Sequence, residues 1–452
     1  APGKNFLDCG EFACTIDKTP QALAIAIAKL QLKNPAAVLS GRIAFSQEAA
    51  QPSKDKGGAP APAATWLVDL SGQNLDLSAI RQTVLALFGD HHVAQLVCDI
   101  VKGGTANQAS YYFQGPLTDF QHLEKMRIQV AVDRADVHPP GTHLKLREVG
   151  GPIEIRDGYL SGHELRARLG NSVGSNCSLY LDLLQRKNEF RLDLEIEADL
   201  ADLPQVLLDE VKHQVFHDEV RRFRDCRGRA HGRLNIGETL DNPQVTVLVD
   251  RMEGSGQYDR VSWPFNIGQG TLAVYPDRLI WRDVKGSWGT QQIHDSTGEV
   301  EWHGPATIKQ SSLNATLDLA PLLNELSGTP AIAATIGKAL TGAKGIVELK
   351  DAAFSGSLEK PESWRYSCSL NSEGSRWISP LLPQPFWAEN LRATIDQERI
   401  ELAETRLRFL EQPLTVQGNF LHNRLEEWRG WASFSGTVEE KLADLIRGKG
   451  WI

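Results

Sequence analysis

Long apolar runs and an excess of positive charge are both missing from this 452-residue sequence. The longest apolar run covers residues 22–28, whereas a membrane-spanning helix needs about 20 consecutive apolar residues. No basic segment followed by an apolar one opens the chain. Lysine and arginine total 48 against 57 for aspartate and glutamate, which gives a net charge of −9. Such a chain has no general attraction for nucleic-acid phosphates, so we expect no nucleic-acid partner.

Catalytic sequence signatures are absent as well. The chain has no G-x-S-x-G elbow, no phosphate-binding loop and no dinucleotide fingerprint after a predicted strand. Its six cysteines form no C-x-x-C pair, and only Cys9 and Cys14 lie close together. We therefore expect no enzyme, no cofactor and no metal, and the disulfide state of Cys9 and Cys14 stays open.

Three other cysteines alternate in step with apolar neighbours. Cys98 alternates in step with Leu96 and Ile100, Cys177 with Leu179 and Leu181, and Cys368 with Tyr366 and Leu370. Side chains two apart on a strand face the same side of the sheet. We therefore expect these thiols to behave as small hydrophobic side chains on the apolar faces of strands.

Histidines and carboxylates that could support chemistry have simpler interpretations. His213 and His217 stand four apart on a predicted helix, but they lie off its apolar stripe and do not form H-E-x-x-H. Solvated histidines are the favoured interpretation over a metal pair. Glu195 and Glu197 could serve a glycosidase, yet they share the polar side of a predicted strand.

One basic cluster interrupts the acidic background, at residues 221–229. Arg221, Arg222 and Arg224 follow the end of a predicted helix. The favoured interpretation is a solvated helix end, and contact with an anionic lipid head group is the alternative.

Alternation of apolar and polar residues is the dominant pattern of the chain. Residues 190–200 place apolar side chains on one side and charged ones on the other, and residues 126–132 and 313–319 repeat this. Such strands have one face in water and one against an apolar partner. Glycine precedes many of them, as at Gly41, and we expect it to lead the chain into each new strand. The residues we expect on the apolar face include Phe190, Leu192, Leu194, Ile196, Ile128, Val130, Leu317 and Leu319.

Helices are predicted to be few. Ser78 is an expected N-cap for a short helix with Ile80, Val84, Leu87 and Phe88 on one stripe. A longer helix is predicted over about 202–223, and shorter ones over 321–326, 330–340 and 439–447. Residues 51–64 are rich in proline, glycine and alanine between two predicted strands, so we expect a long mobile hairpin loop there.

A sheet with one apolar face and few helices needs another way to hide that face. With roughly 15 residues per strand and turn, the chain supplies about 30 strands and would extend on the order of 140 Å. We predict a mainly β fold: an elongated, curled antiparallel sheet that forms an apolar groove, with a few short capping helices. Such a groove suits acyl chains, since about 30 methylenes of two lipid tails are worth on the order of 20 kcal/mol when kept from water. A closed barrel or a two-sheet sandwich would leave no groove.

The order of glycines, strands and aspartate–glycine turns resembles a known family. Residues 68–77 followed by a short helix, Gly103-Gly104 and residues 113–115 carry this rhythm, and residues 155–172, 279–289 and 298–302 repeat it. The pattern is similar to the AsmA-like proteins of Gram-negative envelopes, the AsmA, TamB and YhdP-type chains, over most of residues 37–436. The resemblance implies a periplasmic protein with a groove that bridges the membranes and conducts phospholipid. It implies no catalytic residues.

The resemblance also implies an N-terminal inner-membrane helix, which this sequence does not contain. We therefore expect residues 1–452 to be a single elongated segment of a longer, membrane-anchored periplasmic protein. Its expected function is phospholipid binding and transfer between the inner and outer membranes, and membrane proteins are further candidate partners. The alternatives are a scaffold or assembly factor for outer-membrane biogenesis and a polysaccharide-active β-solenoid enzyme.

Overall fold

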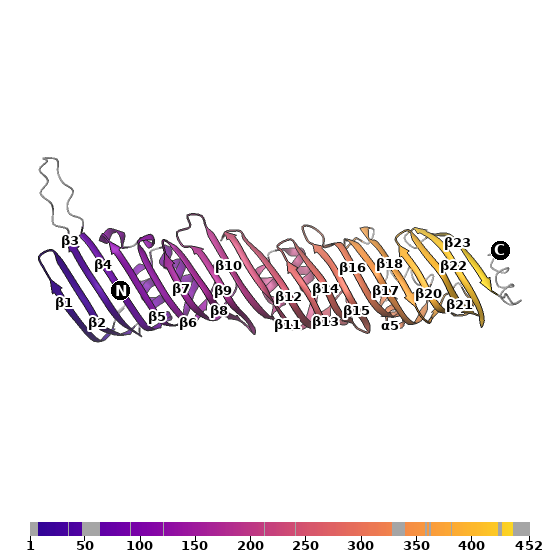
Figure 1. Cartoon of the computed structure of the whole chain (residues 1–452), viewed down its shortest axis with the longest axis horizontal. Coiled ribbons are helices and arrows are strands. Elements are labelled where there is room, and N and C mark those ends of the chain that lie inside the picture. The colour runs from indigo at the N-terminus through magenta and orange to yellow at the C-terminus, as the bar shows by residue number, and fades with distance from the viewer. Residues whose placement is uncertain are drawn as a thin grey trace, which may run out of the picture. The chain divides into compact units, whose positions relative to one another are not determined.

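The computed structural model describes residues 8–34, 36–47, 64–90, 92–120, 122–211, 213–239, 241–327, 340–357, 359–360, 363–380, 382–423 and 427–436. Strands make up 70% of the structure, and the helices in this described part are few and short (Figure 1). The strand pairs with a defined register are all antiparallel. The prediction of a mainly β, antiparallel protein with a few short helices is confirmed.

The chain forms two compact units. Unit 1 comprises Ala1–Asp202 and His231–Val247, and unit 2 comprises Leu203–Ala230 and Leu248–Ile452. The chain passes between them three times: at Asp202 and Leu203, and within the two long strands β11 (Phe223–Thr239) and β12 (Pro243–Tyr258). Because two of the three crossings lie inside strands, no linker composition marks them in the sequence.

Unit 1 is built from antiparallel strands that pair in chain order. Its helices are α1 (Leu77–Phe88) and α2 (His92–Ile100), with short 3-10 turns at Leu117–Asp119 and Leu123–Lys125. Of the mobile hairpin loop predicted at 51–64, residues 51–63 lie outside the described residues, whereas Ala64 begins β4 (Ala64–Asp76) and pairs with Gln47. The strands are β1 (Asp8–Lys18), β2 (Ala22–Asn34), β3 (Ala36–Gln47), β4 (Ala64–Asp76), β5 (Val101–Gly115), β6 (Met126–Val137), β7 (Leu146–Arg156), β8 (Tyr159–Leu169), β9 (Ser172–Asp182) and β10 (Glu189–Asp199).

Unit 2 continues the same pattern of consecutive antiparallel strands. Its described helices are α3 (Leu203–Glu210), α4 (Gln214–Val220) and α5 (Leu319–Ser327). The short strands β18 and β19 both pair with β17 on one side and β20 on the other. The strands after β12 are β13 (Val261–Val274), β14 (Arg278–Trp288), β15 (Gln291–Glu301), β16 (Thr307–Asp318), β17 (Gly342–Ser357), β18 (Arg365–Ser372), β19 (Ser375–Ile378), β20 (Phe386–Asp396), β21 (Arg399–Phe409), β22 (Gln412–Asn423) and β23 (Glu427–Gly436).

The strand register aligns apolar side chains of unit 1 into continuous rows. The first apolar row crosses all ten strands from β1 to β10, and the second lies beside it, two residues away on each strand except β2, where a register shift makes the spacing three. The first row contains Cys14, Ile27, Gly41, Leu70, Tyr111, Ile128, Ile155, Leu160, Leu181 and Phe190. The second row contains Phe12, Leu30, Leu39, Gly72, Ala109, Val130, Ile153, Gly162, Leu179 and Leu192.

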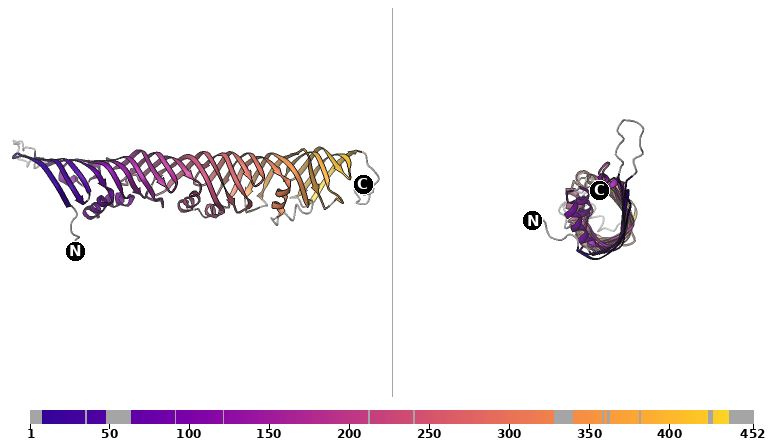
Figure 2. Two further views of the ribbon diagram at one scale, coloured as in Figure 1. Left: turned by 90° about the horizontal axis from the view of Figure 1, so that it is seen from below. Right: turned by 90° about the vertical axis from the view of Figure 1, so that its left-hand side faces the viewer.

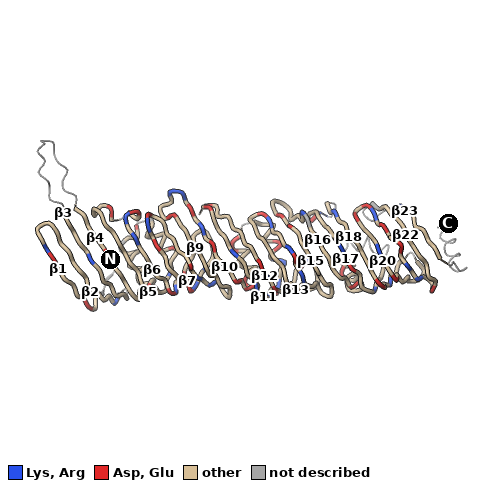
Figure 3. The backbone as a smooth tube through the Cα atoms, in the orientation of Figure 1, with Lys and Arg blue, Asp and Glu red and all other residues tan. Residues whose placement is uncertain are grey.

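Between these two rows the opposite face of the sheet is polar. Side chains alternate across a strand, so the residues between two inward positions must point outward. The intervening register row is Ser40, Ser71, Ser110, Gln129, Glu154, Ser161, Tyr180 and Arg191. Charged residues of both signs are spread along the strands (Figure 3). The sequence alternation therefore corresponds to one apolar and one polar face.

β-Bulges in the middle of neighbouring strands bend the sheet of unit 1. The register shifts between β5 and β6, between β6 and β7, between β7 and β8 and between β8 and β9. At these places Glu148, Glu164 and Asn176 take left-handed backbone conformations, with φ between 50° and 53°. A bulge kinks its strand and increases the local twist. The strands of unit 1 accordingly curve, and α1 and α2 lie on the inner side (Figure 2).

Two glycines lie inside strands, where the backbone departs from regular geometry, rather than at the start of a strand. Gly41 lies in the middle of β3 with φ 147°, and Gly104 lies within β5 with φ 108°. The prediction that glycine leads the chain into each new strand is therefore wrong at Gly41. The reason is close backbone approach: a Cβ on Gly41 would lie 2.8 Å from the Leu70 Cα.

We expect Gly104→Ala to destabilise unit 1 by about 2 kcal/mol or more. The new Cβ would require a positive φ and would lie 2.6 Å from the Ala135 Cα. Gly115→Ala on the same strand is the matched control, because its nearest neighbour would be the Phe113 ring at 3.4 Å. Urea unfolding followed by hydrogen exchange of unit 1 peptides measures both. Equal stability of the two variants would contradict the role of Gly104 at the bend.

The helices cover parts of the apolar faces. Val93 of α2 is buried in a core with Leu160, Leu181 and Phe190, and Ile80 of α1 packs on a core around Leu75 and Ala106. In unit 2, Phe216 and Val220 of α4 pack with Trp302. α2 was not predicted, so the placement of Cys98 on a strand is wrong: Cys98 is buried on α2.

Other helix predictions were partly correct. Asp76, not Ser78, caps α1, because its carboxylate accepts hydrogen bonds from the backbone of Ser78 and Ala79. The helix expected over about 202–223 is two helices, since His213 takes an extended backbone and the ring of His217 binds the Val211 carbonyl at the end of α3. The helix expected at 321–326 is α5. The helices expected at 330–340 and 439–447 lie outside the described residues, apart from Leu340.

Candidate functional site

The second apolar row of unit 1 is half-buried over much of its length, and Ile153, Leu179 and Leu192 pack against the core that includes Val93. Val130 and Leu192 lie in it and are half-buried. Leu194 and Ile196 continue along β10 and are half-buried too, and Leu194 lies over Gly174 of β9, where no side chain opposes it. Leu194 itself occupies the space over Gly174, since its Cδ1 lies 2.7 Å from the position of a Cβ on that glycine.

The first apolar row is accessible only in its first part. Ile128 is half-buried, whereas Ile155, Leu160 and Leu181 are buried. Phe190 is 2% exposed and belongs to the core that includes α2. Phe190 was expected to line a groove, but its burial under α2 leaves it no surface for a ligand in this conformation.

Unit 2 has a comparable surface, which we call the third apolar row. Leu317 is half-buried on β16, whereas Leu319 is 8% exposed and begins α5, so it does not lie on the strand expected at 313–319. Most members of the row are half-buried. The third apolar row contains Ile267, Gly286, Ile293, Ala315, Leu349, Leu370, Ala393, Leu402, Gly418 and Ala432.

The three arginines of the basic cluster each pair with a carboxylate. Arg221 lies 3.3 Å from Asp218, and Arg222 lies 3.5 Å from Glu219. Arg224 binds Asp259. These pairs neutralise the charges that an anionic head group would need, so the geometry favours the interpretation as a helix end.

Glu219 anchors α4 to the turn between β12 and β13. Partial burial disfavours its ionised form, but hydrogen bonds from Arg260 and Tyr258 prevail and lower its pKa below the ordinary value. Burial, with the same hydrogen bond, raises the pKa of Tyr258 to about 12. This network stabilises the protein as long as Glu219 is ionised.

The candidate metal and redox residues do not assemble into a site. Within the described ranges no group of three histidine, cysteine, aspartate or glutamate side chains could hold a metal ion. The six cysteines are free thiols. Burial raises the pKa of the Cys177 thiol to about 11, which makes it a poor nucleophile near neutral pH.

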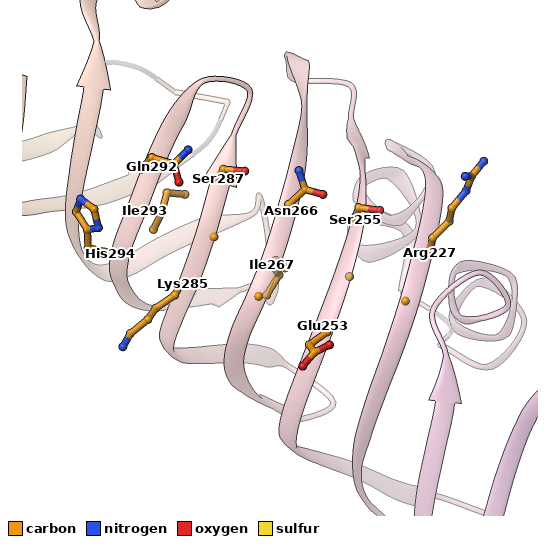
Figure 4. A pocket seen from close by; sticks show the side chains of 14 residues that line it. Arg227, Glu253, Ser255, Asn266, Ile267, Lys285, Ser287, Gln292, Ile293 and His294 are labelled. Carbon is orange, nitrogen blue, oxygen red and sulfur yellow. The ribbon is translucent and has the colours of Figure 1, made fainter. Parts of the chain in front are cut away.

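A shallow pocket of about 920 Å³ lies on unit 2, and Ile267, Gly286 and Ile293 of the third apolar row help to line it. Its side chains come from β11 to β15, with Arg227, Ser255, Asn266, Ser287 and Gln292 in one row across the sheet (Figure 4). Sequence reasoning missed this pocket because its polar residues are spread over 68 positions of the chain, from Arg227 to His294. The further lining residues are Gly228, Glu253, Gly254, Ile267, Gly268, Lys285, Gly286, Ile293 and His294.

The fold and these surfaces define an antiparallel β protein with one apolar and one polar face. No helix in the described part of the chain is long and apolar enough to cross a bilayer. Comparison with protein-family models, curated proteins and solved structures finds no match to this chain.

Proposed function

We propose that this chain is a lipid-binding protein of the cell envelope, which holds phospholipid acyl chains on its apolar sheet faces and passes phospholipid between the inner and outer membranes. One observation carries the proposal: apolar side chains remain in register over ten strands in each unit and stay half-buried over much of that distance. The resemblance of the sequence to AsmA-like chains supports the periplasmic setting. The role is binding and transfer rather than catalysis.

The energetics favour acyl chains as the ligand. Each methylene kept from water contributes about 0.8 kcal/mol, so a 16-carbon chain is worth on the order of 10 kcal/mol. Neighbouring strands lie about 4.8 Å apart, so ten strands give a row of roughly 40 Å, longer than an extended acyl chain. Repeated similar contacts along such a row would allow movement without one deep binding site. The polar head group would stay in water.

Photocrosslinking tests the lipid contact directly. A photoreactive amino acid at Ile196, on the apolar side of β10, is expected to label radioactive phospholipid at least about tenfold more than the same probe at Glu197. Ile196 is half-buried and Glu197, one residue along, is exposed on the polar side. Because the two probes differ only in the face they occupy, equal labelling would overturn the proposal.

A charge at Leu194 is expected to remove this labelling. Leu194→Glu places a carboxylate beside Ile196, and keeping it ionised against an acyl chain costs more than the roughly 1.4 kcal/mol that corresponds to tenfold in binding. Leu194→Met keeps the volume and the apolar surface and is the control. Circular dichroism verifies that both variants fold. If Leu194→Glu is labelled as strongly as the unmodified chain, the lipid does not contact this part of β10.

A further inference from the structure

Three large hydrophobic side chains are exposed on strands β17, β19 and β20 of unit 2. They are Ile346, Ile378 and Trp387, and the indole of Trp387 is 45% exposed. Phe386 and Ala388, on either side of Trp387, face the interior: Phe386 packs against the core at β21 and β22, and Ala388 is fully buried. Side chains alternate across a strand, so Trp387 points away from this core. Packing of unit 2 therefore does not account for an indole at this position.

The strand register places Trp387 in a row of cations on this outward side. Lys344 of β17 pairs with Arg376 of β19, Arg376 pairs with Trp387 of β20, and Trp387 pairs with Arg408 of β21. All four side chains are exposed, and the row is about 14 Å long at the usual strand spacing. Each exposed isoleucine lies two residues along its strand from one of these cations and so on the same face. We call this surface the outer patch: Lys344, Ile346, Arg376, Ile378, Trp387 and Arg408.

The cations of the outer patch are available to a ligand. Lys344 and Arg376 form no ion pair or side-chain hydrogen bond within the described ranges. Arg408 lies 2.8 Å from Glu389, but both side chains are largely exposed, and such surface pairs contribute little. Glu373 is exposed in the turn before β19. Three cations beside these two carboxylates leave the patch positive, in a chain whose net charge is −9.

The position of the outer patch excludes several ligands. β17 and β20 have paired strands on both sides, so no free sheet edge is present there for an added peptide strand. Three cations are too few for stable binding of nucleic acid. The pocket of unit 2 includes none of the patch residues, and small-molecule sites are concave. The patch is therefore suited to an extended surface.

The chemistry of the outer patch matches the surface of an anionic bilayer. Indole rings favour the boundary between lipid head groups and acyl chains, because one part of the ring is apolar and its N–H is polar. Lysine and arginine can lay their apolar stems along such a boundary while their charged ends reach lipid phosphates. Apolar insertion and attraction to anionic lipid each give weak binding alone, and stable attachment combines the two. The outer patch supplies both.

We propose that unit 2 docks on an anionic membrane surface through the outer patch, with Trp387, Ile346 and Ile378 among the head groups and Lys344 and Arg376 on lipid phosphates. The docking surface and the apolar face that would hold acyl chains lie on opposite sides of the same strands. Docking therefore does not depend on acyl-chain binding, and it leaves the apolar face free. The proposed function does not say which part of the chain meets a membrane; this inference assigns that contact to β17–β21.

Flotation of the full chain with lipid vesicles tests the docking. Vesicles of phosphatidylcholine are compared with vesicles that also contain phosphatidylglycerol, and we expect binding to the anionic vesicles. Trp387→Ala is expected to weaken this binding at least about tenfold. Trp431→Ala is the matched control, because Trp431 is also exposed but lies on β23, outside the outer patch.

The charges of the patch are tested by a pair of double variants. Lys344→Gln with Arg376→Gln is expected to weaken binding to the anionic vesicles about tenfold and to make the remainder less sensitive to salt. Arg229→Gln with Arg282→Gln removes the same charge from exposed positions of unit 2 outside the patch and should leave binding unchanged.

Fluorescence quenching locates the indole. Phospholipid brominated close to the head group should quench part of the tryptophan fluorescence of the vesicle-bound chain. Trp387→Phe keeps an aromatic ring in the patch but should lose this quenched part, whereas Trp431→Phe should retain it. Equal quenching in the two variants would mean that Trp387 does not enter the bilayer surface.

Three further results would overturn the proposal. The first is the absence of flotation of the unmodified chain with anionic vesicles. The second is equal weakening by Trp387→Ala and Trp431→Ala, or by the two double variants. The third is loss of flotation in Leu194→Glu, with no loss in Trp387→Ala, since the vesicles would then be held through the apolar face. Docking that survives Leu194→Glu, in contrast, stands even if the acyl-chain proposal fails.

Discussion

Phe190→Ala is expected to lower the stability of unit 1 by about 3–5 kcal/mol. The ring is 2% exposed and packs in the core that α2 covers, among Leu181, Leu183 and Val93. Truncation removes the apolar contacts and leaves a cavity that ten paired strands cannot close easily. Hydrogen exchange read by mass spectrometry resolves the effect, because peptides from unit 1 and unit 2 report separately. Faster exchange is expected in β9, β10 and α2.

Leu194→Ala on the same strand provides the comparison. Leu194 is half-buried and lies outside the core that contains Phe190, so its truncation should cost about 1–2 kcal/mol at most. A similar loss for the two variants would mean that α2 does not secure Phe190, and that the first and second apolar rows are equally open.

The difference between Phe190 and Leu194 shows what the apolar–polar alternation of β10 predicts: the face on which a residue lies, but not whether a helix covers that face. The period of two correctly predicts which residues share a face, because it follows from the geometry of a single strand. It places Phe190 and Leu192 together, and they do share the apolar face. Whether a helix covers that face depends on residues almost a hundred positions earlier, in α2, and local periodicity contains no information on this.

The basic cluster shows that the sequence also does not reveal which charged residues are paired in the fold. Arg221, Arg222 and Arg224 are conspicuous because they are close in sequence. Asp259, the partner of Arg224, is 35 residues away, at the turn between β12 and β13. The strand pairing that brings them together is a property of the fold, so the sequence overstated the free positive charge.

The pocket of unit 2 could not be predicted from the sequence for a further reason. The sequence does not show whether close backbone contact requires a glycine within a strand. Only the structure separates Gly286, which close backbone contact requires, from Gly268, which has empty space around it. The difference is one of surroundings rather than residue type.

Trp302→Ala is expected to release α4 from unit 2, at a local cost of about 3–5 kcal/mol. The indole is 5% exposed, packs against the tilted ring of Phe216 with ring centres 5.1 Å apart, and donates a hydrogen bond to the Pro276 carbonyl at 3.0 Å. Its loss removes the main apolar support of a seven-residue helix, which is too short to persist in isolation. Hydrogen exchange at residues 214–220 should then approach that of an unfolded segment.

Trp387→Ala is the matched control for this change. Trp387 lies in the same unit but is 45% exposed on β20, so we expect a change within about 1 kcal/mol and no effect on α4. Protection of α4 that survives Trp302→Ala would assign its support to the Glu219–Arg260 ion pair instead.

The same variant is expected to bind more lipid, because α4 and an acyl chain would contact the same side chains. Trp302→Ala should therefore bind more of a fluorescent fatty-acid analogue than Trp387→Ala. If α4 is released and binding of the analogue is unchanged, the surface under this helix is not part of the lipid path and α4 is structural.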